Sequence, residues 1–235
     1  VGGKRAPIIN ISGGTEIMGC LLSPLPITPL KISSLVGPGL GMDVAIYDND
    51  GKRMEKGLGH LVCRKPAPSM TKGFLNDPQR YLDTYFSVWK DVWYHGDWAE
   101  IDDDGLWYIL GRSDDTIKVA GKRTGPAEIE SALLEHNAVM EAAAVGVPDP
   151  IKGQDVVTFV VLKPEFNPDE ELREELRNQV VKHMGKTLKP KALLFVEALP
   201  KTRSAKILRG VIKRKYLGED VGDIASAENP DAIEA

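Results

Sequence analysis

The sequence has few of the residues that usually announce a redox, metal or membrane role. Its two cysteines, Cys20 and Cys63, lie in apolar strand-like stretches, which favours two buried thiols in a reducing compartment over a disulfide. Its four histidines show no metal-ligand spacing. No apolar run approaches membrane-spanning length and no signal peptide is visible, so we expect a cytoplasmic protein without a membrane span.

Charge of one sign is also scarce. The formal net charge of −4, from 30 basic and 34 acidic residues, gives no general attraction to nucleic acid or to an anionic membrane. The four tryptophans are expected to pack in a core rather than to stack on bases. The sequence contains no Gly-x-x-x-x-Gly-Lys-Ser/Thr loop and no nucleophile elbow around Ser12 or Ser204. Phosphate binding must therefore come from local clusters of residues.

What the chain does have is enough apolar material for a core. At 235 residues and 42% hydrophobic content, it is typical of a soluble protein of one or two domains. Because it opens on Val1 rather than Met, we expect it to be a piece of something longer.

The first half reads as strands and hairpins. A short buried strand is expected at 7–11 and an ordered Pro- and Gly-rich loop at 21–41, and a helix is predicted to start at Pro78. Further strands are predicted at 42–48, 59–64, 93–101 and 106–111. The turns at 49–52 and 102–105 make two hairpins, and the spacing suggests a β-barrel-like fold.

After residue 111 the pattern changes to mixed helices and strands. Helices are predicted at 126–136, after Asp169 and at 207–216, and strands at 139–147, ended by Pro148, 155–162 and 192–196. Residues 112–217 are thus predicted to form a compact α+β domain of their own. Residues 218–235 are acidic and are interpreted as a mobile tail, with docking onto the body of the protein as the alternative.

The segment 111–130 is the most informative about function. It combines glycines with the adjacent acids Asp114 and Asp115 and with four cations, and then opens a helix. A short linker with few apolar anchors is where backbone torsions change easily. We interpret it as a hinge that carries charged groups to an anionic ligand.

Two acidic positions in the first half suggest nucleotide chemistry. In Ser12-Gly13-Gly14-Thr15-Glu16 the glycines let backbone approach a ligand closely, and Glu16 could meet a hard cation such as Mg²⁺. Asp97, after His95-Gly96, could accept both hydroxyls of a ribose. The alternatives are a tight turn with a solvated acid and an aspartate that caps a hairpin.

These segments, over residues 8–217, resemble the acyl-adenylate-forming enzymes: acyl-CoA synthetases, luciferases and peptide-synthetase adenylation domains. The resemblance implies that Gly13, Gly14 and Thr15 lie near the AMP phosphate and that Glu16 binds Mg²⁺. It also implies that Asp97 and Arg112 hold the ATP ribose, and that a small lid domain swings about Asp114.

Two cationic elements complete the resemblance. Lys118 and Arg123 match cations that face the active site, Lys118 in the orientation that forms the thioester with CoA, and Gly121 matches the glycine that lets the pantetheine arm of CoA pass. Pro200 to Arg209 resembles the loop whose lysine, here Lys206, bridges carboxylate and α-phosphate during adenylation. The family usually has glycine where this chain has Ala205. The alternative for all these cations is a solvated basic surface.

The resemblance implies an acetyl-CoA-synthetase-like acyl-CoA synthetase that uses ATP, Mg²⁺, CoA and a small carboxylic acid. Residues 1–111 would be the end of its large AMP-binding domain and 112–217 its lid. The phosphate-gripping loop of the family is missing here, so this polypeptide alone is expected to be inactive without the remainder of the large domain. Acetate-specific members carry Trp where this chain has Gly13, which suggests an acid larger than acetate. The chain could form oligomers. A peptide-synthetase adenylation domain and a non-catalytic remnant that binds nucleotide or a partner protein remain alternatives.

Overall fold

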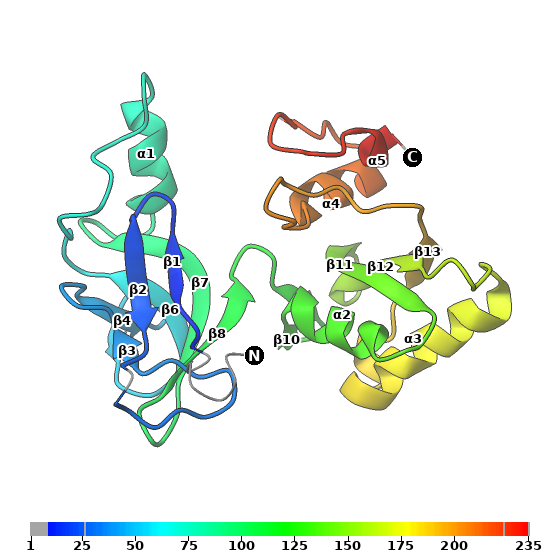
Figure 1. Cartoon of the computed structure of the whole chain (residues 1–235), viewed down its shortest axis with the longest axis horizontal. Coiled ribbons are helices and arrows are strands. Elements are labelled where there is room, and N and C mark those ends of the chain that lie inside the picture. Colours follow the sequence, from blue (N-terminus) through cyan, green and yellow to red (C-terminus); the bar gives the residue numbers. More distant parts are fainter. Residues whose placement is uncertain (1–8, 26, 223, 235) are drawn as a thin grey trace. The chain divides into compact units, whose positions relative to one another are not determined.

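The computed structural model describes residues 9–25, 27–222 and 224–234, and the chain divides into two compact units that meet between Asp114 and Asp115. Unit 1 ends at Asp114 and unit 2 begins at Asp115 (Figure 1). Each unit has its own hydrophobic core. The predicted α+β class is confirmed, with strands dominating unit 1 and helices packed on a sheet in unit 2.

Among the residues that the structure describes, unit 1 holds two antiparallel sheets and the helix α1. The smaller sheet has the order β1-β2-β3, with β1 (Ser12–Gly14), β2 (Gly19–Ser23) and β3 (Gly37–Pro38). The larger sheet has the order β5-β4-β6-β7-β8, with β4 (Val44–Tyr47), β5 (Arg53–Met54), β6 (Gly57–Cys63), β7 (Trp93–Ile101) and β8 (Trp107–Arg112). The two predicted hairpins are confirmed. The strands that were expected to build a β-barrel-like fold are found in these two sheets.

The helix of unit 1 begins where the sequence predicts. α1 (Pro78–Tyr85) has proline in its first turn, and the Asp77 side chain accepts a hydrogen bond from the Arg80 amide at 3.1 Å. Tyr85 stacks on Trp93 with ring centroids 3.9 Å apart, which joins the helix to β7. Trp93 and Trp107 are buried in this core, as predicted for the tryptophans.

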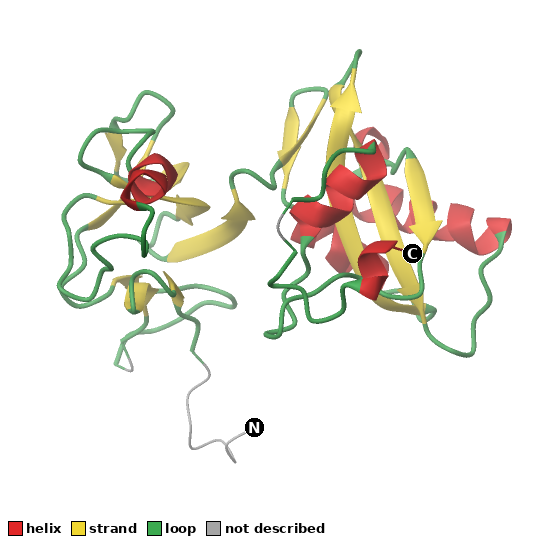
Figure 2. Ribbon diagram, turned by 90° about the horizontal axis from the view of Figure 1, so that it is seen from above, coloured by secondary structure: helices red, strands yellow, loops and turns green. Residues whose placement is uncertain are grey.

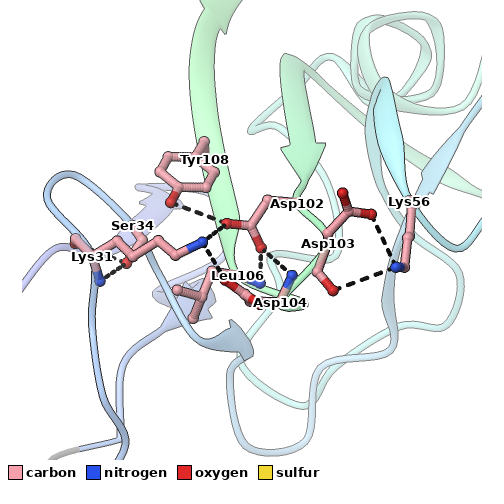
Figure 3. A network of polar contacts seen from close by, with 8 residues as sticks. All are labelled: Lys31, Ser34, Lys56, Asp102, Asp103, Asp104, Leu106 and Tyr108. Carbon is pink, nitrogen blue, oxygen red and sulfur yellow. Dashed lines mark hydrogen bonds and ion pairs between the residues drawn. The ribbon is translucent and has the colours of Figure 1, made fainter.

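An acidic turn fastens two loops of unit 1 to the β7–β8 hairpin (Figure 3). Lys31 pairs with Asp102 at 2.6 Å and with Asp104 at 2.5 Å, while Lys56 pairs with Asp103 at 3.1 Å. The other Asp102 oxygen accepts the Leu106 amide at 2.9 Å, which closes the turn. The hydrogen bond from Lys31, the largest cause, lowers the pKa of Asp102. The turn therefore joins loops distant in sequence.

Unit 2 is a five-stranded sheet covered on both faces (Figure 2). Its order is β10-β9-β12-β11, and β13 lies parallel to β12. The strands are β9 (Ile117–Val119), β10 (Lys122–Thr124), β11 (Val139–Asp149), β12 (Gly153–Leu162) and β13 (Ala192–Phe195). The helices are α2 (Pro126–Leu134), α3 (Glu170–Met184), the 3₁₀ helix η2 (Lys186–Leu188), α4 (Arg209–Leu217) and α5 (Asp231–Glu234).

The nearly continuous apolar runs of β11 and β12 are explained by this burial. Alternate residues of a strand point to opposite faces. Val156 and Val160 of β12 pack in the cluster that contains Ile129 of α2 and Leu176 of α3. Val157 and Val161 pack instead in the cluster that contains Ile212 of α4. A strand buried on both faces is apolar on both, so the alternation of apolar and polar residues is lost.

Three expectations about elements differ from the structure. Residues 7 and 8 of the expected strand at 7–11 lie outside the described residues, and Ile9 and Ile11 are exposed and not in a strand. The loop expected at 21–41 contains parts of β2 and β3. Pro148 does not end β11, which continues to Asp149. In the described sheet β11 is an edge strand, with only β12 beside it. An edge strand tolerates proline, which has no amide hydrogen to donate.

The acidic segment after residue 217 is not a loose tail in the part of it that is described. Ala227 bridges to Thr202, and the Glu228 amide donates to the Lys201 carbonyl at 2.8 Å. The Asn229 side-chain amide bonds the backbone of Lys201 and of Leu199, which precede Thr202 in the chain. These polar pairings, which composition does not reveal, dock the segment on residues 199–202.

The two thiols are not bonded to each other. Cys63 is buried, and burial raises its pKa, whereas Cys20 is only half-buried. The expectation of buried thiols is therefore correct for Cys63. Among the helices that the structure describes, none combines the length and the apolar character that crossing a bilayer would need.

Candidate functional site

The β1–β2 turn carries the Gly-Gly-Thr-Glu segment. Gly13 pairs with Cys20 and Gly14 with Gly19 across the hairpin. The amide of Ile17 donates to the Gly14 carbonyl at 3.1 Å, which closes the turn and leaves Thr15 exposed. A Cβ on Gly14 would lie 2.5 Å from Glu16 Oε2 and 3.3 Å from His95 Cε1. The absence of a side chain at Gly14 thus allows the turn to approach β7.

Gly13 has no room for a side chain in this backbone. A Cβ there would lie 2.2 Å from the Gly19 carbonyl oxygen, at a register shift between β1 and β2. A tryptophan like that of acetate-specific enzymes could be accommodated only if backbone moved. A simple exchange of Gly13 for Trp would therefore report on strand pairing as well as on pocket size.

Asp97 and Arg112 face each other across β7 and β8. They are paired in the sheet register, and Arg112 Nη1 lies 3.7 Å from Asp97 Oδ1. The same guanidinium donates to the His95 carbonyl at 2.8 Å. It lies over Gly96, where φ is 82° and a Cβ would be 2.7 Å from Nη2. Glycine therefore allows the cation to lie flat beside the carboxylate.

His95 is buried between the turn and the acid. The Trp93 indole donates to its Nδ1 at 3.4 Å, so the neutral ring carries its proton on Nε2, 3.5 Å from Asp97 Oδ2. Burial lowers the pKa of His95, and the opposing effect of Asp97 does not restore it. The ring is consequently neutral near pH 7 and orients the carboxylate that faces it.

Glu16 is the acid of this site that could serve a metal ion. Its side chain is hydrogen-bonded to Tyr85 of α1. Burial, and then this hydrogen bond, raise the pKa of Tyr85. Within the described residues no group of three or more His, Cys, Asp or Glu side chains could hold a metal by itself. Mg²⁺ is commonly bound by one or two carboxylates together with substrate phosphates. A single carboxylate beside Gly14 fits a Mg²⁺ that arrives with a nucleotide, and does not fit an all-protein cage.

Asp114, the expected hinge residue, is paired to the same arginine. Arg112 Nε donates to Asp114 Oδ1 at 3.0 Å, and the Ser113 amide donates to the Gly96 carbonyl at 2.8 Å. The last residues of unit 1 are thus held to β7, and the chain passes into unit 2 directly after them.

In unit 2, the β9–β10 hairpin presents two cations together. Arg123 stands directly opposite Lys118 in the register, and the turn residues Ala120 and Gly121 have φ of 48° and 83°. The Lys118 amide is fixed by Gln154 Oε1 at 2.8 Å. Like charges directly opposite in a sheet repel each other. Both cations are exposed on the surface of unit 2.

Lys206 lies on a second hairpin of unit 2, formed by residues 200–208. Lys201 and Ile207 bridge its two arms, and the Thr202 amide donates to the Lys206 carbonyl at 2.9 Å. Lys206 is exposed, and its ammonium has no hydrogen bond or ion pair with any residue that the structure describes. Figure 1 shows this segment beside α4, in a part of unit 2 separate from β10.

The structure therefore brings together some predicted residues and separates others. Gly14, Glu16, Asp97 and Arg112 gather around His95 in unit 1. Lys118, Gly121 and Arg123 share one hairpin, and Lys206 is on another. Sequence reasoning missed Tyr85 and the central position of His95. The spacing of Trp93, His95 and Asp97, two residues apart on one strand face, was the available signal for His95.

Comparison with known proteins gives a consistent picture. Residues 128–206 match the family described as AMP-binding enzyme C-terminal domain. The acetyl-coenzyme A synthetase of Methanothrix thermoacetophila is 43% identical over 240 residues, which cover 100% of this chain and 36% of that protein. The acetyl-coenzyme A synthetase of Syntrophus aciditrophicus is 44% identical, over 95% of this chain and 35% of its own length. The chain spans about a third of the length of these relatives.

Solved structures agree with the sequence matches. The acetoacetyl-CoA synthetase from Streptomyces lividans superposes with a TM-score of 0.87 at 30% identity, covering 99% of this chain and 36% of that one. The o-succinylbenzoate CoA synthetase from Bacillus subtilis, solved with its acyl-adenylate intermediate, gives 0.72 at 26% identity over 88% of this chain and 41% of that one.

Proposed function

Because the chain belongs to the AMP-binding, adenylate-forming family and is homologous over its whole length to the C-terminal third of acetyl-CoA synthetases, we propose that it is the C-terminal part of an AMP-forming acyl-CoA synthetase. The main structural support is the cluster of Gly14, Glu16, Asp97 and Arg112 around His95, which combines a close backbone approach with a paired acid and cation.

The proposed reaction has two steps. A carboxylate oxygen attacks the α-phosphorus of ATP, the bond to the bridging oxygen breaks, and pyrophosphate leaves. The CoA sulfur then attacks the acyl carbon, the bond to AMP breaks, and the thiol proton is released. Mg²⁺ held by Glu16 and the phosphates would offset phosphate charge.

The residues of unit 1 hold the nucleotide in this proposal. Asp97 accepts hydrogen bonds from the ribose hydroxyls. Arg112, whose Nη1 lies 3.7 Å from Asp97 Oδ1, contacts the same sugar. Neutral His95 keeps Asp97 oriented without neutralising it. Gly13, Gly14 and Thr15 lie along the phosphate of AMP.

The residues of unit 2 serve the two steps from different hairpins. The Lys206 ammonium stabilises the charge that develops between carboxylate and phosphate in the first step. Lys118 and Arg123 face the second step, and Gly121 lets the pantetheine arm pass. A rotation about Asp114 exchanges one hairpin for the other.

An exposed apolar surface on unit 1 supports a larger protein. Ile27, Ile32 and Leu40 are 93%, 94% and 94% exposed, and Met18 is 81% exposed. Exposed large apolar side chains that form a patch mark a surface that another part of a protein covers. We propose that the remainder of the large domain, with the phosphate-gripping loop, covers them.

The acid is proposed to be larger than acetate. Gly13 provides no side chain to close an acyl pocket, and its backbone does not admit one. Relatives of this chain are named for acetate and a similar solved structure for acetoacetate. We expect an acid of about the size of the larger of these two.

The test is carboxylate-dependent ATP–pyrophosphate exchange. This polypeptide would be assayed beside the longest in-frame gene product, over acids from two carbons upward. We expect activity only in the long form, with an acid above two carbons best. No activity in the long form would overturn the synthetase proposal and favour a non-catalytic binding role, whereas a clear preference for acetate would overturn the pocket argument alone.

A further inference from the structure

The hairpin that carries Lys206 is a small element outside the main sheet. Its arms are joined by the Lys201–Ile207 bridge, and the Leu208 amide donates to the Pro200 carbonyl at 2.9 Å. An isolated two-stranded hairpin is marginally stable in water. Its tip has no glycine, and Ala205 takes a left-handed φ of 61°. The hairpin therefore needs support from elsewhere to hold the lysine in one place.

The segment 227–229 provides that support. Ala227 bridges to Thr202 and the Glu228 amide donates to the Lys201 carbonyl at 2.8 Å, so this segment is bonded along the first arm of the hairpin. Figure 1 shows this red segment of the chain close to α4. The other side of Lys201 is anchored by an ion pair with Glu141 of β11.

One side chain completes the attachment. Asn229 Oδ1 accepts the Lys201 amide at 2.9 Å, and Asn229 Nδ2 donates to the Leu199 carbonyl at 2.9 Å. An amide offers an acceptor and a donor at once, whereas a carboxylate offers only acceptors. Asn229 thus binds the backbone at the root of the first arm, where that arm leaves the body of unit 2.

We propose that Asn229 is a positioning residue for Lys206, an inference that rests on the function proposed above. It fixes the root of the hairpin so that the ammonium meets carboxylate and phosphate at hydrogen-bond distance. A misplacement of about 1 Å costs roughly 100-fold in a well-oriented reaction. The effect is confined to adenylation, because Lys118 and Arg123 lie on the β9–β10 hairpin, a different element from the hairpin that Asn229 supports.

The experiment separates the two half-reactions in the longest in-frame gene product. Asn229→Ala is expected to slow acid-dependent ATP–pyrophosphate exchange by about 10- to 100-fold. Thioester formation from supplied acyl-adenylate and CoA should change less than about twofold, because it does not use Lys206. Asn178→Ala, the same substitution on the exposed face of α3, is the matched control and should leave both rates unchanged.

A double variant tests whether Asn229 acts through the lysine. If it does, Asn229→Ala should add almost nothing to the loss caused by Lys206→Ala, because residues that act as a unit are not additive. A multiplied loss in the double variant, or an equal loss in both half-reactions, would mean general damage and overturn the proposal. An unchanged rate of ATP–pyrophosphate exchange in Asn229→Ala would overturn the proposal as well.

Backbone hydrogen exchange keeps the test independent of activity. In Asn229→Ala the amides of Lys201 and Thr202 should exchange at least about tenfold faster, while those of β12 stay protected. If the unmodified long form lacks pyrophosphate exchange, the proposed function fails. The amide measurement then still decides, since unaltered protection at Lys201 would refute the role of Asn229.

Discussion

Ala205 occupies a backbone conformation that alanine rarely adopts. Its φ of 61° lies in the left-handed region, where an L-residue with a side chain crowds the following carbonyl. The loop holds this conformation through the bond from its amide to the Thr202 carbonyl at 2.8 Å. His95 is a second residue in an unusual state, since it is buried as a neutral ring among charged neighbours.

Ala205→Gly should stabilise unit 2 by up to about 1 kcal/mol, because relief of the left-handed strain outweighs the added chain entropy of glycine. The measurement is denaturant unfolding followed by helical circular dichroism. Ala127→Gly, on the exposed face of α2, is the control and should lose about 1 kcal/mol. If Ala205→Gly and Ala127→Gly changed the free energy of unfolding in the same direction, strain at Ala205 would be contradicted.

The stability of unit 1 should fall as pH drops below about 6.5, the ordinary pKa of histidine. Burial lowers the pKa of His95 in the folded protein, so the unfolded chain binds the proton more readily there and acid favours unfolding. Thermal unfolding at pH 7.5 and pH 5.5 would measure this effect. His95→Gln should have a smaller difference between the two pH values than the unmodified chain, and an identical difference would assign the pH effect to other groups.

At the scale of elements, one buried ion pair connects three pieces of unit 2. Glu130 of α2 is bonded to Arg209 of α4 at 2.6 and 2.7 Å, and it also accepts the amide of Ala144 in β11 at 2.9 Å. The hydrogen bond with Glu130, the largest cause, raises the pKa of Arg209. Since α2 and α4 cover opposite faces of the sheet, this pair ties the two hydrophobic clusters together.

Glu130→Ala should lower the free energy of unfolding of unit 2 by about 3 kcal/mol, because it leaves a half-buried guanidinium and the buried amide of Ala144 without this acceptor. The exposed α3 pair of Arg173 and Glu170 is the control, and Glu170→Ala should cost less than about 1 kcal/mol. The double variant of Glu130 and Arg209 should cost less than the sum of its single variants. Additive losses would show that the two side chains stabilise unit 2 separately.

At the scale of the whole molecule, the two units carry different spectroscopic probes. All four tryptophans, Trp89, Trp93, Trp98 and Trp107, precede the division at Asp114, whereas α2, α3 and α4 follow it. Each unit also has its own core. Tryptophan fluorescence therefore reports on unit 1, and the helical signal reports mainly on unit 2.

We expect the two probes to give separable unfolding transitions. Glu130→Ala should shift the helical transition to lower denaturant and leave the fluorescence transition in place, because the residue is buried wholly within unit 2. Lowering the pH from 7.5 to 5.5, where His95 of the unfolded chain gains a proton, should shift the fluorescence transition and leave the helical transition in place. A coincident shift of both probes would show that the units unfold as one.

The local chemistry of this protein was determined by its sequence. Pro78 after Asp77, and Asp169 before an amphipathic run, mark helix starts that the structure confirms, because a cap requires only neighbours in the chain. The hairpin turns at 49–52 and 102–105 are confirmed for the same reason. The apolar run at 155–162 likewise predicted a strand, and the structure confirms it as β12.

Only the tertiary structure decided what depends on residues distant in the sequence. It placed His95 between the β1–β2 turn and Asp97, left no space for a side chain at Gly13, and kept Pro148 within an edge strand. It docked Asn229 under the Lys206 hairpin, although composition suggested a loose tail. In each case the outcome depends on a backbone group or a buried volume contributed by a remote segment, and no local pattern records which segment that is.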